Sequence, residues 1–166
     1  MREPIRDRSR LEHIKAAIER ILDNTKNIAL ETLSSNVLVY YGVVKNIEII
    51  GEAAYNLTVS FRESHSETPW KDVIRMRNVL VHDYYKIDES EVRYVIEDNL
   101  VPLYKQVNRY LAETDWNEWE NNEQAKTESA VHKTLTQTAQ RMKKDGLSCK
   151  QISRYTGLTE DEIEHI

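Results

Sequence analysis

The sequence has few of the residues that build disulfide-stabilised or loop-rich proteins. It contains one cysteine, four glycines and three prolines among 166 residues. A lone cysteine, Cys149, cannot form an internal disulfide, which is typical of proteins kept in a reducing cytoplasm. Glycine and proline are the residues that most tight turns require, so their scarcity favours long helices over a chain of short strands.

Long apolar segments are also absent. The residues before Arg10 are charged and no apolar segment follows them, so the pattern of a signal peptide is missing. The longest apolar run, 37–44, stops at Lys45 and is far too short to span a bilayer. We therefore expect a cytoplasmic protein with no membrane partner.

The charge balance limits the function as well. The formal net charge is −5, so the chain lacks the basic excess that is the simplest sign of nucleic-acid binding. Any contact with RNA must depend on a local group of cations. A length of 166 residues allows one domain with a real core and a small appendage.

Apolar residues recur at helical spacing over the first two thirds of the chain. The pattern predicts one helix over 8–24 and a longer one over 35–61. Thr68-Pro69 is typical of a helix start and opens a third helix that reaches about Tyr85. These amphipathic helices, with short connections between them, predict an all-α protein built as an antiparallel bundle.

A fourth helix is predicted to begin at Asp88, with Glu91 three residues further on in the position of a capping-box partner. Its apolar face runs to Leu111, and Pro102 within it is expected to produce a kink.

The composition changes at about residue 113. Residues 114–126 are acidic and polar, and we interpret them as a linker or a short helical turn in which Trp116 and Trp119 cover the end of the bundle. Residues 127–166 contain a helix, a glycine, and two short helices with capping boxes, which is the pattern of a small helix-turn-helix-like tail.

The most informative segment is the nonapeptide 77–85, with the sequence RNVLVHDYY. It places Arg77, His82 and Tyr84 within an otherwise apolar run. Arginine is always charged and binds phosphate through paired hydrogen bonds, and histidine is the side chain best suited to proton transfer near neutral pH. Grouping these side chains is costly if they only pack, so the segment predicts a site that handles phosphate.

This segment resembles the R-x4-H-x-Y signature of the HEPN superfamily, in its HepT-like toxin and ribonuclease branch. Asn78 fits the polar residue that follows the arginine, and the segments 46–53 and 68–72 resemble the flanking helices of that branch. The resemblance covers about residues 5–112. It implies a four-helix HEPN-type bundle as the domain 5–113, and a homodimeric endoribonuclease that is the toxin of a toxin–antitoxin pair. The antitoxin partner it implies is a nucleotidyltransferase.

The residue types suggest how such a site would cut RNA. His82 would remove the proton of a ribose 2′-hydroxyl, which then attacks the neighbouring phosphorus. Arg77 would stabilise the extra negative charge of the transition state, and Asn78 would orient a phosphate oxygen or the imidazole. DNA lacks the 2′-hydroxyl and should not be cut. The sequence has neither a cluster with metal-ligand spacing nor a glycine-rich phosphate loop, so no metal and no cofactor is expected.

Helical spacing alone does not complete this site. Each residue of a helix advances about 100°, so Arg77 and Tyr84 share a face, while Asn78 and His82 share another face more than a quarter-turn away. Arg75 aligns with His82. A two-fold dimer would bring two copies of the motif to one cleft, which is also the arrangement that the HEPN resemblance implies.

Several neighbouring residues have more than one interpretation. The resemblance implies that Tyr84 is the residue to which the nucleotidyltransferase attaches AMP, although Tyr84 could also stack on a base, and Tyr85 is a second candidate acceptor. Glu48 and Glu52 lie one turn apart and are predicted to pair with the motif arginines rather than to bind a metal. The other histidines are expected to be solvated: His13, His65, His132 and His165.

Two other functions stay open. The chain could be a non-catalytic HEPN dimer that binds a nucleotide or a nucleotidyltransferase. The motif itself could also be structural, because an Arg-x4-His pattern in a helix can reflect a salt bridge plus a capped histidine. It could also be a DNA-binding regulator that uses its tail, although the acidic segment 160–164 argues against this.

Overall fold

The computed structural model describes residues 6–82 and 88–166, without the side chains of residues 78–82. The described residues form helices and no strands, so the predicted all-α class is confirmed. None of the described helices is both long and apolar enough to cross a membrane. The chain divides into two compact units, residues 1–116 and residues 117–166.

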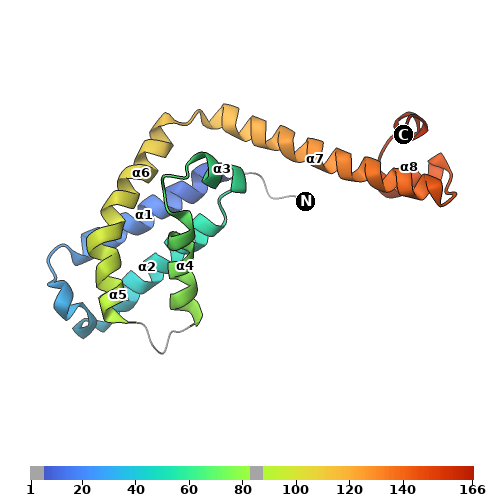
Figure 1. Cartoon of the computed structure of the whole chain (residues 1–166). Helices are drawn as coiled ribbons and strands as arrows, with labels where there is room; N and C mark the ends of the chain where they lie inside the picture. The colour runs from blue at the N-terminus through green and yellow to red at the C-terminus, as the bar shows by residue number, and fades with distance from the viewer. Residues whose placement is uncertain (1–5, 83–87) are drawn as a thin grey trace. The chain divides into compact units, whose positions relative to one another are not determined.

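The first unit is a helical bundle with α2 (Val37–Tyr55) at its centre (Figure 1). Helix α1 (Asp7–Thr25) packs against α2 and is followed by the short 3-10 helix η1 (Leu30–Ser35). Helix α4 (Trp70–His82) packs on another side of α2. The predicted helix over 8–24 is therefore confirmed, because its apolar stripe is the face that α1 buries.

The predicted continuous helix over 35–61 is wrong, because α2 ends at Tyr55 and a separate helix, α3 (Val59–Ser64), follows. The break is stabilised by a contact far away in the sequence. The carboxylate of Asp7 accepts hydrogen bonds from the backbone N–H and the hydroxyl of Thr58, at 2.8 and 2.7 Å. Thr58 is thereby held in an extended conformation, and its hydroxyl oxygen caps α3 by accepting from the N–H of Phe61.

Helix α4 begins at Trp70, directly after Thr68-Pro69, as predicted. Its predicted end near Tyr85 lies outside the described residues. Helices α2 and α4 approach each other closely at Gly51, because a Cβ added there would collide with the Cβ of Arg77 and lie 3.2 Å from the carbonyl oxygen of Val73. The missing side chain of Gly51 therefore fixes the position of Arg77 on the bundle.

The predicted fourth helix consists of three segments: α5 (Glu89–Tyr94), a π-helical turn η3 (Val95–Asn99) and α6 (Leu100–Glu113). Asp88 caps α5 as expected, by accepting a hydrogen bond from the N–H of Ser90. The irregularity that Pro102 predicts is found just before it, where the N–H of Leu100 bonds to the carbonyl of Val95. Pro102 has no N–H to donate to the carbonyl of Asp98, four residues earlier, and its ring crowds that carbonyl. The wider π-helical turn relieves this steric crowding.

Aromatic rings close one end of this bundle around Phe61, which is fully buried. Trp116 stacks on Phe61 with 6.0 Å between the ring centroids, and Tyr110 meets Phe61 edge-on at 5.9 Å. Trp116 therefore covers the bundle end, as the sequence predicted.

Residues 114–126 differ from the expected linker. Helix α7 starts at Trp116 and continues without interruption to Lys144. No glycine or proline occurs between residues 103 and 145, and glutamate, glutamine, alanine and lysine are good helix formers, so nothing ends the helix before Gly146. The prediction of a linker or a short helical turn did not take this absence of helix-breaking residues into account.

The second unit consists of most of α7 with α8 (Cys149–Thr156) and α9 (Glu160–Glu164). Both predicted capping boxes are present, at Ser148 and at Thr159. Gly146 and Gly157 adopt positive φ angles of 88° and 74°, as expected for glycines that end helices. A small core holds the three helices together: Ala139, Ile152, Leu158 and Ile163.

Candidate phosphate-handling site

A hollow of about 350 Å³ opens on the first unit between α1, α2 and α4. We call it the Arg77 hollow. The described residues that line it include three cations, two carboxylates and the apolar side chains of Ile49 and Ala53. The charged and titratable lining residues are Arg10 and His13 from α1, Lys45, Glu48 and Glu52 from α2, and Arg77 from α4.

Arg77 faces α2 from the middle of the motif helix. Its Nη2 lies 2.8 Å from Oε2 of Glu52, and the two side chains are 32% and 51% exposed. The predicted pairing of Glu52 with a motif arginine is therefore present. At this exposure solvent screens the ion pair, so a competing anion can replace the carboxylate at modest cost.

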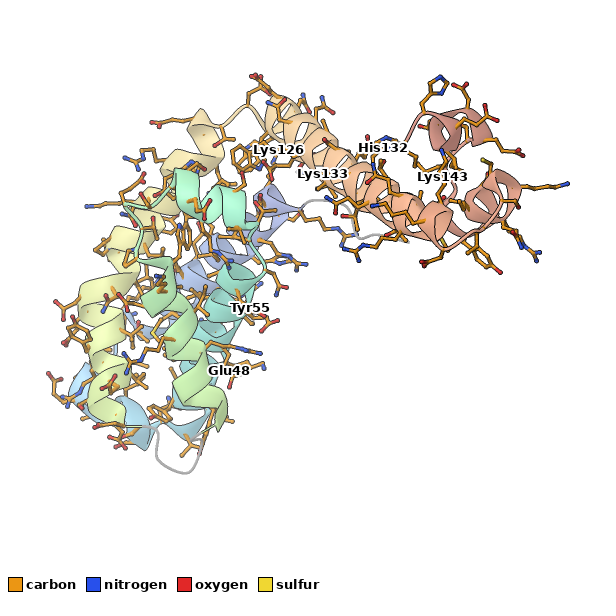
Figure 2. The ribbon with its side chains drawn as sticks, turned by 45° about the vertical axis from the view of Figure 1, so that its right-hand side comes forward. Glu48, Tyr55, Lys126, His132, Lys133 and Lys143 are labelled. Atoms are coloured by element: carbon orange, nitrogen blue, oxygen red, sulfur yellow. The ribbon has the colours of Figure 1, made fainter. Side chains whose placement is uncertain are left out.

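Glu48 pairs with Lys45, at 2.7 Å, and not with a motif arginine. Figure 2 shows Glu48 on α2, with Tyr55 two turns further along the same helix. Arg75 is exposed and is not among the residues that line the hollow. Of the four auxiliary candidates, the structure thus brings Glu48 and Glu52 to the hollow and leaves Arg75 outside it, while Tyr85 lies outside the described residues.

The remaining motif residues are described less fully. The backbone of Asn78 and His82 continues α4, which ends at His82, but their side chains are not described. Tyr84 lies outside the described residues. The catalytic roles of Asn78 and His82 and the modification of Tyr84 therefore stay predictions.

Sequence reasoning missed Arg10, His13 and Lys45 as neighbours of Arg77. His13 was expected to be a solvated histidine without a role, and it is exposed, but it lies on the rim of the same hollow. Arg10 and His13 are three residues apart and so share a face of α1. Nothing in their spacing indicates which helix they face, because the packing of α1 against α2 is a tertiary feature.

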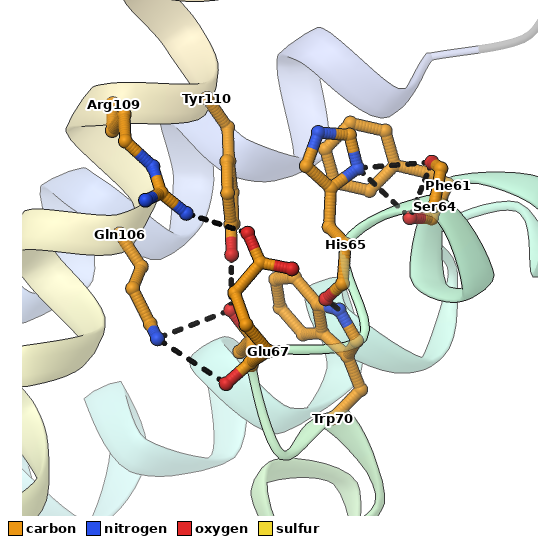
Figure 3. A network of polar contacts seen from close by, with 9 residues as sticks. Phe61, Ser64, His65, Glu67, Trp70, Gln106, Arg109 and Tyr110 are labelled. Atoms are coloured by element: carbon orange, nitrogen blue, oxygen red, sulfur yellow. Dashed lines mark hydrogen bonds and ion pairs between the residues drawn. The ribbon is translucent and has the colours of Figure 1, made fainter.

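A second polar cluster joins the start of the motif helix to α6, and we call it the Tyr110 network (Figure 3). The hydroxyls of Tyr110 and Thr68 share a hydrogen bond of 2.6 Å. Arg109 forms an ion pair with Glu67 at 2.5 Å. The ring of His65 stacks on Phe61 with 4.1 Å between centroids. Burial raises the pKa of the Tyr110 phenol, so the neutral form is favoured.

The Tyr110 network also borders a hollow, of about 340 Å³. Its lining carries one cation, Arg109, against the carboxylates of Glu67 and Glu113. Glu67 has a lowered pKa, chiefly because its carboxylate accepts a hydrogen bond from its own backbone and also from Tyr110. An excess of ionised carboxylate makes this hollow a poor site for phosphate.

Among the side chains that the structure describes, no group of three histidine, cysteine, aspartate or glutamate residues is arranged to hold a metal ion. Glu48 and Glu52 each face a cation in the Arg77 hollow. Their arrangement is that of charge partners for Lys45 and Arg77.

The described fold is an all-α domain in which α4 carries Arg77 and His82. The family model described as Ribonuclease HepT-like matches residues 14–110, more than half of the chain, and the chain belongs to this family. This family match confirms the predicted resemblance to the HepT-like branch and the predicted class of enzyme, a ribonuclease.

Three relatives show the extent of the similarity. The chain is 36% identical over 101 residues to a “Putative RNase” of Caldanaerobacter subterraneus subsp. tengcongensis, covering 61% of this chain and 90% of the relative. It is 33% identical to a “Probable ribonuclease HepT” of Thermococcus cleftensis, covering 56% and 84%. A “Gamma-glutamylcyclotransferase and putative RNase” of Methanocaldococcus jannaschii is 32% identical, covering 64% and 48%. The comparison with solved structures gave no match.

Proposed function

We propose that this protein is a metal-independent endoribonuclease and the toxin of a toxin–antitoxin pair. The observation that carries the proposal is the position of Arg77. In a chain of the Ribonuclease HepT-like family, it lies on α4, which also carries His82, and it borders an open hollow that two further cations line among the described residues. Glu52, one partner of its guanidinium, is half exposed, so phosphate can replace this carboxylate.

The reaction uses the ribose as its own nucleophile. His82 takes the proton of the 2′-hydroxyl, and the O2′–P bond forms while the P–O5′ bond breaks. The leaving O5′ takes up a proton, so the products end in a cyclic phosphate and a 5′-hydroxyl. Arg77 stabilises the negative charge that develops on the phosphorane oxygens, and Asn78 orients a phosphate oxygen.

Glu52 has a defined part in this scheme. While no RNA is bound, its carboxylate balances the charge of Arg77 and holds the guanidinium over the hollow. The scissile phosphate exchanges places with the carboxylate when it binds. Glu52 is thus a positioning residue for Arg77, and it does not touch the reacting atoms.

A homodimer completes the site. Arg77 and His82 lie more than a quarter-turn apart on α4, so a second copy is the simplest source of the missing group. The start of α2 exposes three large apolar side chains, Val37, Leu38 and Tyr41, which are 59%, 87% and 59% accessible. A patch of this kind on a helix next to the motif helix is suited to cover by an identical surface.

The dimer is tested by light scattering at micromolar concentration. We expect a dimer for the natural sequence and a monomer for Leu38→Asp. Val101→Asp is the matched control, because Val101 is an exposed apolar residue on a different helix, α6. A monomeric natural protein would contradict the dimer.

The nuclease is tested by cleavage of a defined RNA in the presence of EDTA. We expect cyclic phosphate and 5′-hydroxyl ends, no cleavage of the matching DNA, and loss of cleavage in His82→Ala. Growth arrest on expression should disappear with the same substitution. RNA binding without cleavage by the natural sequence would favour the non-catalytic HEPN dimer instead.

The antitoxin part concerns Tyr84. A partner nucleotidyltransferase would attach AMP to the Tyr84 phenol. Tyr84 belongs to the same motif as Arg77, so the added negative charge of about one would compete with RNA phosphate for this arginine. Coexpression followed by intact-mass analysis should show the adduct in the natural sequence and in Tyr85→Phe, but not in Tyr84→Phe. Neutralisation without an adduct on either tyrosine would rule out this mode of control.

A further inference from the structure

The structure brings a group of side chains to Arg77 that the nine-residue motif does not contain. Arg10 and His13 come from α1 and Lys45 comes from α2, and all three border the same hollow as Arg77. We propose that the Arg77 hollow binds a nucleotide of the RNA substrate next to the scissile phosphate, with Arg10 and Lys45 contacting its phosphate. This inference rests on the proposed ribonuclease function.

Charge favours phosphate at this hollow. Among the described residues that line it, three are fixed cations and two are carboxylates. The whole chain carries a net charge of −5, so this local excess runs against the overall balance. A local group of cations is what RNA binding by an acidic protein requires.

Size and polarity also fit one nucleotide. A volume of about 350 Å³ lies at the lower end of the range for small-molecule sites, about 300–1,000 Å³. The apolar wall of Ile49 and Ala53 can contact a ribose or a base while the rim binds the phosphate. A ligand with one apolar and one anionic part matches this lining better than a bare phosphate ion does.

Two cations of the hollow are paired with carboxylates in the absence of RNA and can exchange these carboxylates for RNA phosphates. Glu48 lies 2.7 Å from Lys45, and Glu52 lies 2.8 Å from Arg77. RNA phosphates would replace both carboxylates at once. Removing the charge of Glu48 should therefore strengthen RNA binding, whereas reversing the charge of Lys45 should weaken it.

The test measures binding of a fluorescein-labelled oligouridylate of about eight nucleotides by anisotropy. The full chain carries His82→Ala, so that the RNA stays intact. Adding Arg10→Glu or Lys45→Glu should weaken binding about tenfold and reduce the salt dependence by about one phosphate contact. Adding Glu48→Gln should tighten binding about twofold or more.

The matched control is Lys15→Glu, which makes the same change of charge on α1. Lys15 lies near Glu19, which bonds to Tyr104 of α6, so it is on a different side of α1 from the hollow. It should change binding by less than about twofold. Thermal melts that match the parent protein establish that each variant is folded.

The outcomes separate the two proposals. If the natural sequence cleaves RNA and the changes at Arg10 and Lys45 weaken binding no more than Lys15→Glu does, the hollow is not part of the RNA site. If the natural sequence cleaves nothing but binding still depends on Lys45 and Glu48, the hollow stands and the nuclease proposal fails.

Discussion

Two clusters on the first unit contain the same three residue types, an arginine, a glutamate and a histidine. The Arg77 hollow has Arg77, Glu52 and His13 on its lining. The Tyr110 network has Arg109, Glu67 and His65. Both arginine–glutamate pairs are partly exposed. Residue types and exposure alone therefore do not distinguish the two clusters.

The surroundings separate them. His65 of the Tyr110 network stacks on Phe61, and its carbonyl accepts a hydrogen bond from the indole of Trp70 at the start of α4. Its polar groups thus join the aromatic core to the motif helix. Among the described residues, the lining of the Arg77 hollow instead has more cations than carboxylates, together with the apolar Ile49 and Ala53. The Tyr110 network therefore connects the start of α4 to the rest of the bundle, whereas the Arg77 hollow includes the Arg77 side chain that α4 carries.

The largest expected effect is a difference in RNA cleavage between substitutions of Arg77 and of Arg109. Arg77→Ala should lower the rate of RNA cleavage by about 100-fold or more, because in the proposed mechanism Arg77 stabilises the charge of the transition state. Arg109→Ala should leave the rate within about threefold, because a partly exposed ion pair contributes little to stability. Initial rates at equal protein concentration measure both, and equal losses would remove the distinction between the clusters.

The next effect separates the clusters by stability. Phe61→Ala should lower the free energy of unfolding by about 3–5 kcal/mol, because it leaves a cavity under His65, Tyr110 and Trp116. Lys45→Ala, at the rim of the other cluster, should change it by less than about 0.5 kcal/mol. Urea unfolding curves give both values, and a loss under about 1 kcal/mol for Phe61→Ala would contradict this packing.

Gly51→Ala tests the helix contact beneath Arg77. The added Cβ collides with the Cβ of Arg77, so α2 and α4 must separate, at a cost of about 1–3 kcal/mol. Cleavage should fall as well, because Arg77 moves. Gly42→Ala is the matched control on α2, where a Cβ meets nothing within 4 Å, and it should stabilise the protein by about 0.5–1 kcal/mol. Melting curves and cleavage rates check both variants.

Tyr110→Phe tests the hydrogen bond that ties α6 to Thr68. The substitution removes the phenol hydroxyl, but the hydroxyl of Thr68 still donates a hydrogen bond to Oε1 of Gln106, at 3.1 Å. We expect a loss of about 0.5–1.5 kcal/mol in unfolding free energy and an unchanged chemical step. Urea unfolding and single-turnover cleavage measure these separately; slower chemistry at full stability would assign the network a catalytic part.

The smallest effect is a dependence of stability on alkaline pH. Burial raises the pKa of Tyr110 and of Tyr40 above 10.0 in the folded state. Their contribution to stability is therefore complete below pH 10 and is lost as the pH rises from 10 through the folded pKa values. Unfolding free energies at pH 9 and pH 11 should differ more for the natural sequence than for Tyr110→Phe.

Local sequence signals predicted several parts of the fold well. The stripe of α1, the start of α4 after Pro69, and the capping boxes at Ser148 and Thr159 are all present, because each depends on residues within one or two helical turns. The break between α2 and α3 was missed because its cause, Asp7, is 51 residues away from Thr58.

The sequence by itself determined the helical class, the family motif on 77–85 and the chemistry that arginine and histidine can perform there. These follow from periodicity and residue type, which are local properties. Tertiary structure decided the surroundings of the two similar clusters. It joined Arg10 and Lys45 to Arg77 through the packing of α1, α2 and α4, and it placed Glu52 against the guanidinium. Such contacts join segments far apart in the chain, so no spacing within one helix encodes them.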